Sequence, residues 1–116
     1  MWRIAVAERS MQPALNPGDW LFVRRTIRPG RTLRVRPGQL VVAQHPGRPD
    51  LLVIKRASRR EPGGWWLSSD NPGAGAVDSR AFGPVPAGLI QGTVVLRYHR
   101  GRPRVPYRED GWGPFP

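Results

Sequence analysis

Short runs of apolar, β-branched and aromatic residues alternate along this chain with turns in which proline precedes glycine. Runs of about four to eight such residues between turn signals are typical of β-strands. In the turns, proline fixes φ ahead of a glycine that tolerates unusual backbone angles. The pattern predicts strands at residues 2–7, 20–25, 39–45, 51–58, 64–69 and 89–99. Turns are expected between them at residues 16–19, 28–31, 36–39, 45–50, 61–64 and 70–73.

Helix is expected only as a short turn over residues 10–15. Pro13 is tolerated near the start of a helix, and Pro17 ends it. A strand that stops at Ser10 and then turns sharply would hold the serine hydroxyl in a fixed position. The predicted fold class is therefore mostly β.

The length of the chain, 116 residues and 13.0 kDa, is that of one domain with a single modest core. Its 14 glycines and 14 prolines favour turns and leave little room for helix, which supports the β prediction. We predict one domain over residues 1–106, followed by an aromatic tail with glycine and proline over residues 107–116. The tail has no strand pattern, and it is either disordered or laid over an apolar patch by Trp112 and Phe115.

The net charge of +11 and the pI near 11.8 are typical of proteins that bind nucleic acid or an anionic surface. The basic residues, however, are spread from Arg3 to Arg108 instead of forming one helix or stripe. Arginine-rich coding bias produces the same spread, and we favour that interpretation. A basic β-barrel in which Trp65 and Trp66 stack on nucleic-acid bases is the alternative from another class. No nucleic-acid partner is expected.

Residues that the chain lacks exclude several kinds of chemistry. There is no cysteine, which excludes disulfides, thiolate catalysis and cysteine-based zinc sites. His45 and His99 are not at helical ligand spacing, and we interpret both as ordinary polar residues. The amino terminus lacks a signal-peptide pattern, and nowhere do about 18 apolar residues run together. The sequence therefore predicts a soluble, cytoplasmic protein with no transmembrane anchor and no bound metal.

Lysine occurs once, at position 55, in a chain whose 19 basic residues are otherwise arginine. Arginine does not lose its proton in proteins, whereas a lysine buried among apolar neighbours can have a pKa low enough to act as a base. Lys55 follows the apolar run LLVI, although its neighbour Arg56 also allows a solvated strand end. Because a serine hydroxyl needs a neighbouring base, Ser10 and Lys55 form the most economical nucleophile and base available.

Three stretches resemble the signal peptidase I family and its relatives, which are serine proteases with a Ser-Lys dyad. SMQPALNPGD, residues 10–19, resembles the family's nucleophile box, Ser-Met-x-Pro-x-Leu-x-x-Gly-Asp, and VIKRAS, residues 53–58, is similar to the box that carries the base. SDNPGAGAVDSRAFGPV, residues 69–85, is similar to the third box near the active site. The resemblance implies a compact antiparallel β fold of the signal peptidase and SOS-repressor peptidase type, with the dyad at one end of an extended substrate groove.

The resemblance also implies roles for individual residues. Ser10 would be the nucleophile and Lys55 the base, with the Ser10 backbone N–H at the oxyanion and Met11 lining the groove. Asp70, Asp78, Ser79 and Arg80 would support the active-site loop. A protease of this type needs no cofactor.

Within the family, the short start, the Asp-Asn-Pro of residues 70–72 and the Asp-Ser-Arg-x-Phe-Gly-Pro of residues 78–84 look most like the compact, anchorless subgroup that matures nickel-type superoxide dismutase. That likeness implies a protein substrate, the leader peptide of the dismutase precursor, with nickel belonging to the product. Anchored members place a transmembrane helix ahead of the serine, whereas nine residues precede Ser10 here. The alternatives are signal peptidase I-like processing of secreted precursors and an autoproteolytic relative of the SOS-response repressor.

Two positions depart from the family pattern. Glu8 lies two residues before Ser10, where anchored enzymes often have a small or hydroxyl residue that helps the oxyanion hole. A carboxylate there would be unfavourable unless it points away, so the hole is expected to rely on the Ser10 N–H. The serine that orients the lysine in some relatives falls on Gly75 or Ala76, and Ser79 or a backbone carbonyl is expected to replace it.

Overall fold

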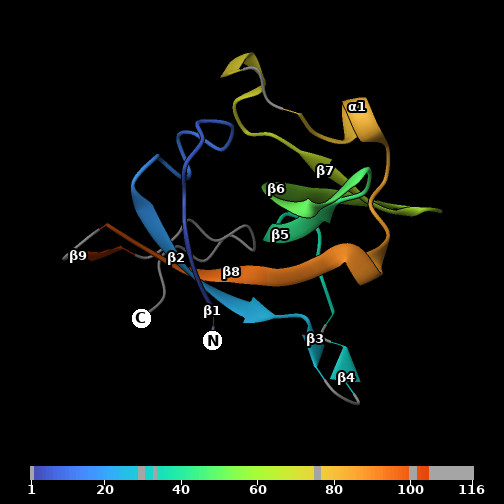
Figure 1. Cartoon of the computed structure of the whole chain (residues 1–116), viewed down its shortest axis with the longest axis horizontal. Helices are drawn as coiled ribbons and strands as arrows, with labels where there is room; N and C mark the ends of the chain where they lie inside the picture. Colours follow the sequence, from blue (N-terminus) through green and yellow to red (C-terminus); the bar gives the residue numbers. More distant parts are fainter. Residues whose placement is uncertain (1, 29–30, 33, 75–76, 100–101, 105–116) are drawn as a thin grey trace.

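A computed structural model describes residues 2–28, 31–32, 34–74, 77–99 and 102–104 (Figure 1). Gly75, Ala76 and the tail predicted over residues 107–116 lie outside the described residues. The predictions made for these segments are therefore not tested by the structure.

Strands form most of the described chain, and each of the six predicted strands is present. They are β1 (Trp2–Ala5), β2 (Asp19–Arg25), β5 (Leu40–His45), β6 (Arg48–Glu61), β7 (Gly64–Ser68) and β8 (Ile90–His99). Three short strands were not predicted because two or three residues carry no readable pattern: β3 (Ile27–Arg28), β4 (Arg31–Thr32) and β9 (Arg102–Arg104). Strand β6 is also longer than the predicted 51–58, because its hairpin ladders reach the tight turns on both sides.

Helix is found in places that the sequence pattern did not indicate. A short helix, α1, covers Ser79–Phe82, and 3-10 turns cover Pro72–Ala74 (η1) and Ala87–Leu89 (η2). The prediction that only residues 10–15 form a helical turn was therefore wrong. The α1 turn is stabilised by Asp78, whose side chain accepts a hydrogen bond from Arg80 N at 3.0 Å and caps the helix. Residues 10–15 make a turn without an assigned helix.

The strands pair in one antiparallel sheet in the order β1, β2, β8, β5, β6, β7, with β9 added beside β8 and β3–β4 as a separate hairpin. Figure 1 shows β8 crossing the molecule between the amino-terminal strands and the β5–β6 hairpin. The predicted fold class, mostly β with antiparallel pairing, is confirmed.

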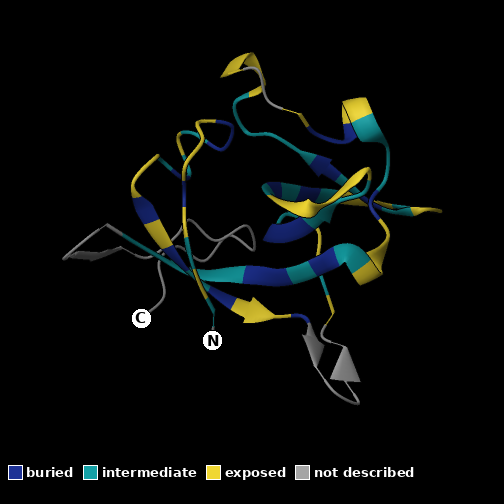
Figure 2. Cartoon of the chain, viewed as in Figure 1, coloured by how far each residue is buried: buried dark blue, intermediate teal, exposed yellow. Residues whose placement is uncertain are grey.

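Both faces of the central strand β5 are buried, and they divide the core into two clusters (Figure 2). Leu40 and Val42 pack with one cluster, which also holds Val6, Met11, Leu15, Leu21 and Val23. Val41 and Ala43 pack with the other, which also holds Ala57, Trp65, Leu67, Val85 and Ile90. Such alternation is what a period of two predicts for a strand covered on both sides. The first cluster anchors the residues around Ser10.

Trp65 is a core residue, only 3% exposed. Its backbone exchanges two hydrogen bonds of 2.8 Å with Val85, which ties the end of the segment 69–85 to the sheet. Gly64 makes this contact possible, because its φ is +135° and a Cβ there would lie 2.1 Å from Val85 O. A buried Trp65 is not available to stack on a nucleic-acid base.

Candidate active site

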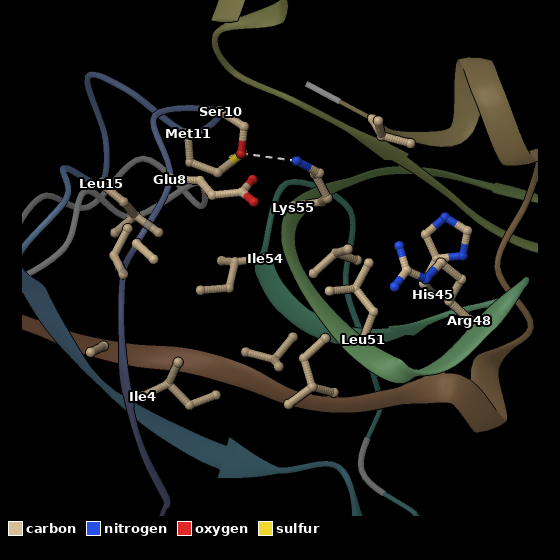
Figure 3. A pocket seen from close by; sticks show the side chains of 17 residues that line it. Ile4, Glu8, Ser10, Met11, Leu15, His45, Arg48, Leu51, Ile54 and Lys55 are labelled. Atoms are coloured by element: carbon tan, nitrogen blue, oxygen red, sulfur yellow. Dashed lines mark hydrogen bonds between the residues drawn. The ribbon is translucent and has the colours of Figure 1, made fainter. Parts of the chain in front are cut away.

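Ser10 and Lys55 lie in direct contact although they are 45 residues apart (Figure 3). Lys55 Nζ donates a hydrogen bond to Ser10 Oγ across 2.9 Å. Both residues are buried, with exposed fractions of 7% for Ser10 and 3% for Lys55. The nucleophile and the base predicted from the sequence are therefore brought together by the fold.

The serine loop, residues 6–18 between β1 and β2, is held by the core beneath it. Met11 and Leu15 are buried in the first cluster, and Leu15 N donates to Met11 O at 2.9 Å. At the far end of the loop, Arg97 of β8 donates a hydrogen bond to Ala14 O. Strand β1 ends at Ala5, so Ser10 lies within this loop and not at a strand end as predicted.

The segment that follows β7 holds the backbone around Ser10 from the other side. Asn71 N donates to Ser10 O at 2.8 Å, and Asn71 Nδ2 donates to Arg9 O at 3.1 Å. Asp70 N donates to Met11 Sδ at 3.4 Å. Met11 therefore contacts the hydrophobic core, the cavity and the segment that follows β7. Asn71 was not among the predicted site residues, because nothing in the sequence shows which backbone an asparagine side chain will bond.

Lys55 lies on β6, between β5 and β7, opposite Val41 of β5. Burial away from water lowers the pKa of Lys55 below its ordinary 10.5, and the carboxylates of Glu8, Asp78 and Asp70 oppose this shift. Burial wins because the charged form loses its hydration, and none of the three carboxylates forms an ion pair with it within 4 Å among the described residues. The side chain therefore favours its neutral form more than a solvated lysine does.

Asp70 forms a two-point ion pair with Arg56, the residue next to Lys55. Arg56 Nη2 lies 2.5 Å from Asp70 Oδ2, and Arg56 Nε donates to Oδ1 at 3.2 Å. Arg56 Nη1 also donates to Gly38 O at 3.1 Å. The pair joins β6 to the segment that holds Ser10. Arg56 was missed in the sequence analysis, where it counted only as a sign of a solvated strand end.

Asp78 organises the turn that carries the other predicted support residues. Its carboxylate accepts hydrogen bonds from Ser69 N at 3.0 Å, Arg80 N at 3.0 Å and Arg80 Nε at 3.1 Å. Burial raises the pKa of Asp78, but these hydrogen bonds outweigh it and hold the pKa below the ordinary 3.8. Ser79 Oγ accepts a hydrogen bond from Leu67 N at 2.8 Å. No hydrogen bond joins Ser79 to Lys55, both of which are described, so Ser79 does not hold the lysine here.

Ser69 is a further buried hydroxyl that the sequence analysis did not single out. Arg56 of β6 pairs with Ser68, the last residue of β7, so Ser69 follows directly after the strand, as Lys55 directly precedes Arg56 on β6. Within the described part of the chain, Ser69 Oγ is buried without a hydrogen-bond partner. No sequence signal separates it from Ser68, whose hydroxyl bonds Ser58 at 2.7 Å, since only the sheet register distinguishes the two.

A cavity of about 470 Å³ opens beside Ser10 and Lys55 (Figure 3). Its walls are mostly apolar and come from the β1 side, residues 4–7, and from β6, residues 51–54. Leu51 and Leu52 are 38% and 43% exposed, and Val77, also in the wall, is 50% exposed. His45 and Arg48 line the cavity away from the dyad. The exposed apolar side chains in its walls suit a bound peptide segment.

Backbone donors are available next to the nucleophile. Among the residues that the structure describes, neither Ser10 N nor Met11 N donates to a protein acceptor. Unpaired N–H groups at a nucleophile can stabilise the negative charge that develops on an attacked carbonyl oxygen.

The carboxylate of Glu8 does not point away from the site, because Figure 3 shows it turned into the cavity toward Lys55.

Replacing Asp70 with alanine is expected to lower the free energy of unfolding by about 1.5–3 kcal/mol, because it removes charge-assisted hydrogen bonds from a largely buried guanidinium. The matched control is Glu61→Ala, which breaks the Arg59–Glu61 pair at 2.7 Å, in which the arginine is 58% exposed. That variant is expected to lose less than about 1 kcal/mol. Urea denaturation measures both, and equal losses would contradict a structural role for the Asp70 pair.

Neither a metal site nor a membrane span is found in the described ranges. No three histidine, aspartate or glutamate side chains there are grouped so that they could hold a metal ion. The described helices are too short and too polar to cross a membrane.

Comparison with known proteins gives one family and several relatives. The family described as Peptidase S24-like matches residues 3–84, which include Ser10, Lys55 and Asp78. Mitochondrial inner membrane protease subunit 1 of Xenopus tropicalis is 29% identical over 108 residues, covering 76% of this chain. The human protein of the same name is 27% identical over the same length. The chain spans 63% of the length of these relatives.

Proposed function

The chain belongs to the Peptidase S24-like family, and from this premise we propose that it is a serine endopeptidase with Ser10 as nucleophile and Lys55 as general base. The observation that carries the proposal is the 2.9 Å hydrogen bond between Lys55 Nζ and Ser10 Oγ in a buried site beside a cavity. Nucleophile and base within hydrogen-bond reach, with unpaired N–H groups next to them, are the requirements of acyl transfer.

The first half of the reaction uses the neutral lysine. Burial favours that form, and its lone pair accepts the Ser10 proton as Oγ attacks the substrate carbonyl carbon. The carbonyl oxygen becomes an oxyanion, and the Ser10 N–H donates to it. When the tetrahedral intermediate collapses, the carbon–nitrogen bond breaks and the Lys55 ammonium gives its proton to the leaving amine.

The second half releases the acyl group. Water enters the place of the leaving amine, and neutral Lys55 takes its proton while the water oxygen attacks the ester carbonyl. Collapse of this intermediate returns the proton to Ser10 Oγ and frees the new carboxyl terminus. Asp70 and Asp78 position other groups of the site and take no part in proton transfer. Asp70 bonds Arg56, and Asp78 bonds Ser69 and Arg80.

The substrate we propose is the leader peptide of a nickel-type superoxide dismutase precursor, cleaved in the cytoplasm. The likeness of residues 70–72 and 78–84 to the enzymes that mature this dismutase supports it. The apolar walls of the cavity, open through Leu51, Leu52 and Val77, are compatible with an extended leader segment. Nickel belongs to the processed product in this reaction.

Co-expression with a nickel-type superoxide dismutase precursor is expected to yield precursor shortened by its leader, as measured by intact mass. A membrane-targeted precursor in a parallel culture provides the comparison. Cleavage of the dismutase precursor alone supports the proposed substrate. An intact dismutase precursor, with a serine-directed peptidase inhibitor still adding its mass to Ser10, would contradict the substrate while leaving the endopeptidase.

A second candidate function is the processing of precursors at a membrane. It is favoured by the similarity to subunits whose names describe a mitochondrial inner membrane protease. Cleavage of the membrane-targeted precursor, together with flotation of the protein with anionic vesicles, would support this function. Nucleic-acid binding is disfavoured, because Trp65 lies in the core and Arg59 stacks over Trp66 at 4.7 Å.

A further inference from the structure

Glu8 places an unpartnered carboxylate in the wall of the cavity. The residue is exposed, and its side chain turns into the cavity on the side of Lys55 (Figure 3). Within the described ranges it takes part in no hydrogen bond and no ion pair within 4 Å. The neighbouring wall from Ile4 to Ala7 is apolar. A carboxylate in such a place has no evident role in holding the fold.

The other carboxylates near the dyad are occupied. Asp70 is paired with Arg56, and Asp78 accepts three hydrogen bonds from Ser69 and Arg80. The other basic side chains in the cavity wall, His45 and Arg48, lie away from the dyad. Glu8 is therefore the carboxylate at the dyad that a bound molecule can reach.

We propose that Glu8 is a specificity determinant that binds a positively charged substrate side chain, arginine or lysine, next to the bond that is cut. This inference rests on the proposed endopeptidase function. Glu8 and Ser10 line the same cavity beside Lys55, so the partner of Glu8 lies close to the attacked carbonyl. Guanidinium groups suit such a site because they pair with a carboxylate through two parallel hydrogen bonds.

The same contact couples substrate binding to the base. The negative charge of Glu8 is the largest of the influences that raise the pKa of Lys55 against the effect of burial. A substrate cation paired with Glu8 offsets that charge, so the pKa of Lys55 falls when the matching substrate is bound. A larger fraction of the enzyme then holds the neutral base at a given pH. The substrate that fits the subsite thus also favours the reactive form of Lys55.

The experiment places arginine, one position at a time, in an alanine-rich peptide that contains a sequence the protein cleaves. The scanned positions run from three residues before the cut bond to two residues after it. At every position the matched peptide carries citrulline, which keeps the shape of arginine without its charge. For the wild-type protein we expect kcat/KM at one position to be about 5- to 30-fold higher with arginine than with citrulline. In Glu8→Gln the ratio is expected to fall to about 1, and Glu8→Arg is expected to favour a glutamate peptide instead.

Glu61→Gln is the matched control, because it removes the same charge at the β6–β7 turn, outside the cavity wall. It should leave the arginine-to-citrulline ratio unchanged. In Glu8→Gln the pH profile for citrulline peptides should move to lower pH, since the pKa of Lys55 loses its largest raising influence. A merely structural role for Glu8 would lower the rates for all peptides alike and leave the ratio intact.

The outcomes separate the inference from the function on which it rests. Cleavage with the same ratio in wild type and Glu8→Gln overturns the subsite and leaves the endopeptidase. If the wild type cleaves neither form at any position and no inhibitor adds to Ser10, the endopeptidase fails, and the subsite fails with it. An arginine preference that depends on Glu8 supports both.

Discussion

Replacing Lys55 with arginine is expected to reduce kcat/KM for precursor cleavage by about 10³-fold or more. Arginine keeps the positive charge and most of the length, and it can still donate to Ser10 Oγ as Lys55 Nζ does at 2.9 Å. It cannot take the serine proton, because a guanidinium stays protonated in proteins. General bases contribute about 10²–10⁴-fold to rate, and Lys55 is the base that hydrogen-bonds the serine hydroxyl.

The measurement for this prediction is a pH–rate profile. Wild-type kcat/KM should rise with pH through the pKa of Lys55, which burial places below 10.5, and then level off. Lys55→Arg should show no such rise. Arg24→Lys, an exchange of the same size at an exposed position on β2, is the control and should retain full activity. More than a tenth of the wild-type rate in Lys55→Arg, with the fold intact by circular dichroism, would exclude Lys55 as the base.

Ser10→Ala is expected to lower kcat by about 10⁴–10⁶-fold while leaving substrate binding within a few fold. The variant removes only the hydroxyl, and the backbone N–H proposed to stabilise the oxyanion stays in place. The buried side chain lies in a loop held by Met11 and Asn71, so the geometry of the cavity is retained. Single-turnover cleavage of the precursor and binding of an uncleaved peptide separate the two effects.

Ser68→Ala and Ser58→Ala are the matched controls for the lost hydroxyl. Their hydroxyls bond one another at 2.7 Å and lie outside the cavity wall. Both variants should cleave at near wild-type rates, and both should still gain the mass of a serine-directed inhibitor. Cleavage by Ser10→Ala at more than about a hundredth of the wild-type rate would assign the nucleophile to another residue.

Local pattern was enough to find the strands, because side-chain alternation and Pro-Gly turns act over a few residues. All six predicted strands are present. The largest error in their bounds is in β6, where polar residues such as Arg59 and Arg60 continue the pairing to the end of a hairpin. The short helix at Ser79–Phe82 was missed because its stability does not come from a repeating local pattern. Its stability depends on the cap by Asp78, and the same carboxylate also bonds Ser69 N from another segment.

Residue type, together with the resemblance of three stretches to a protease family, indicated the chemistry of the candidate site. A single lysine among arginines, in an apolar run, and a serine in a sharp turn predicted the pair that the structure places 2.9 Å apart. The roles proposed for this pair rest on proton affinity, which differs between lysine and arginine wherever they occur. The sequence could therefore identify the residues capable of the reaction before their positions were known.

Tertiary structure decided which hydroxyls and carboxylates serve the fold and which face the cavity. Ser79, which with a backbone carbonyl was one of the two groups expected to hold Lys55, accepts a hydrogen bond from Leu67 N instead. Trp65 lies in the core, and Glu8 turns into the cavity. The burial of Trp65 depends on sheet register, because a shift of one residue would move its side chain to the other face of the sheet. The positions of Ser79 and Glu8 depend on contacts between residues far apart in the chain. The sequence by itself determined the strands and the reactive residue types, since these follow from local geometry and intrinsic chemistry. Only the folded chain determined their partners, since partners are set by long-range packing.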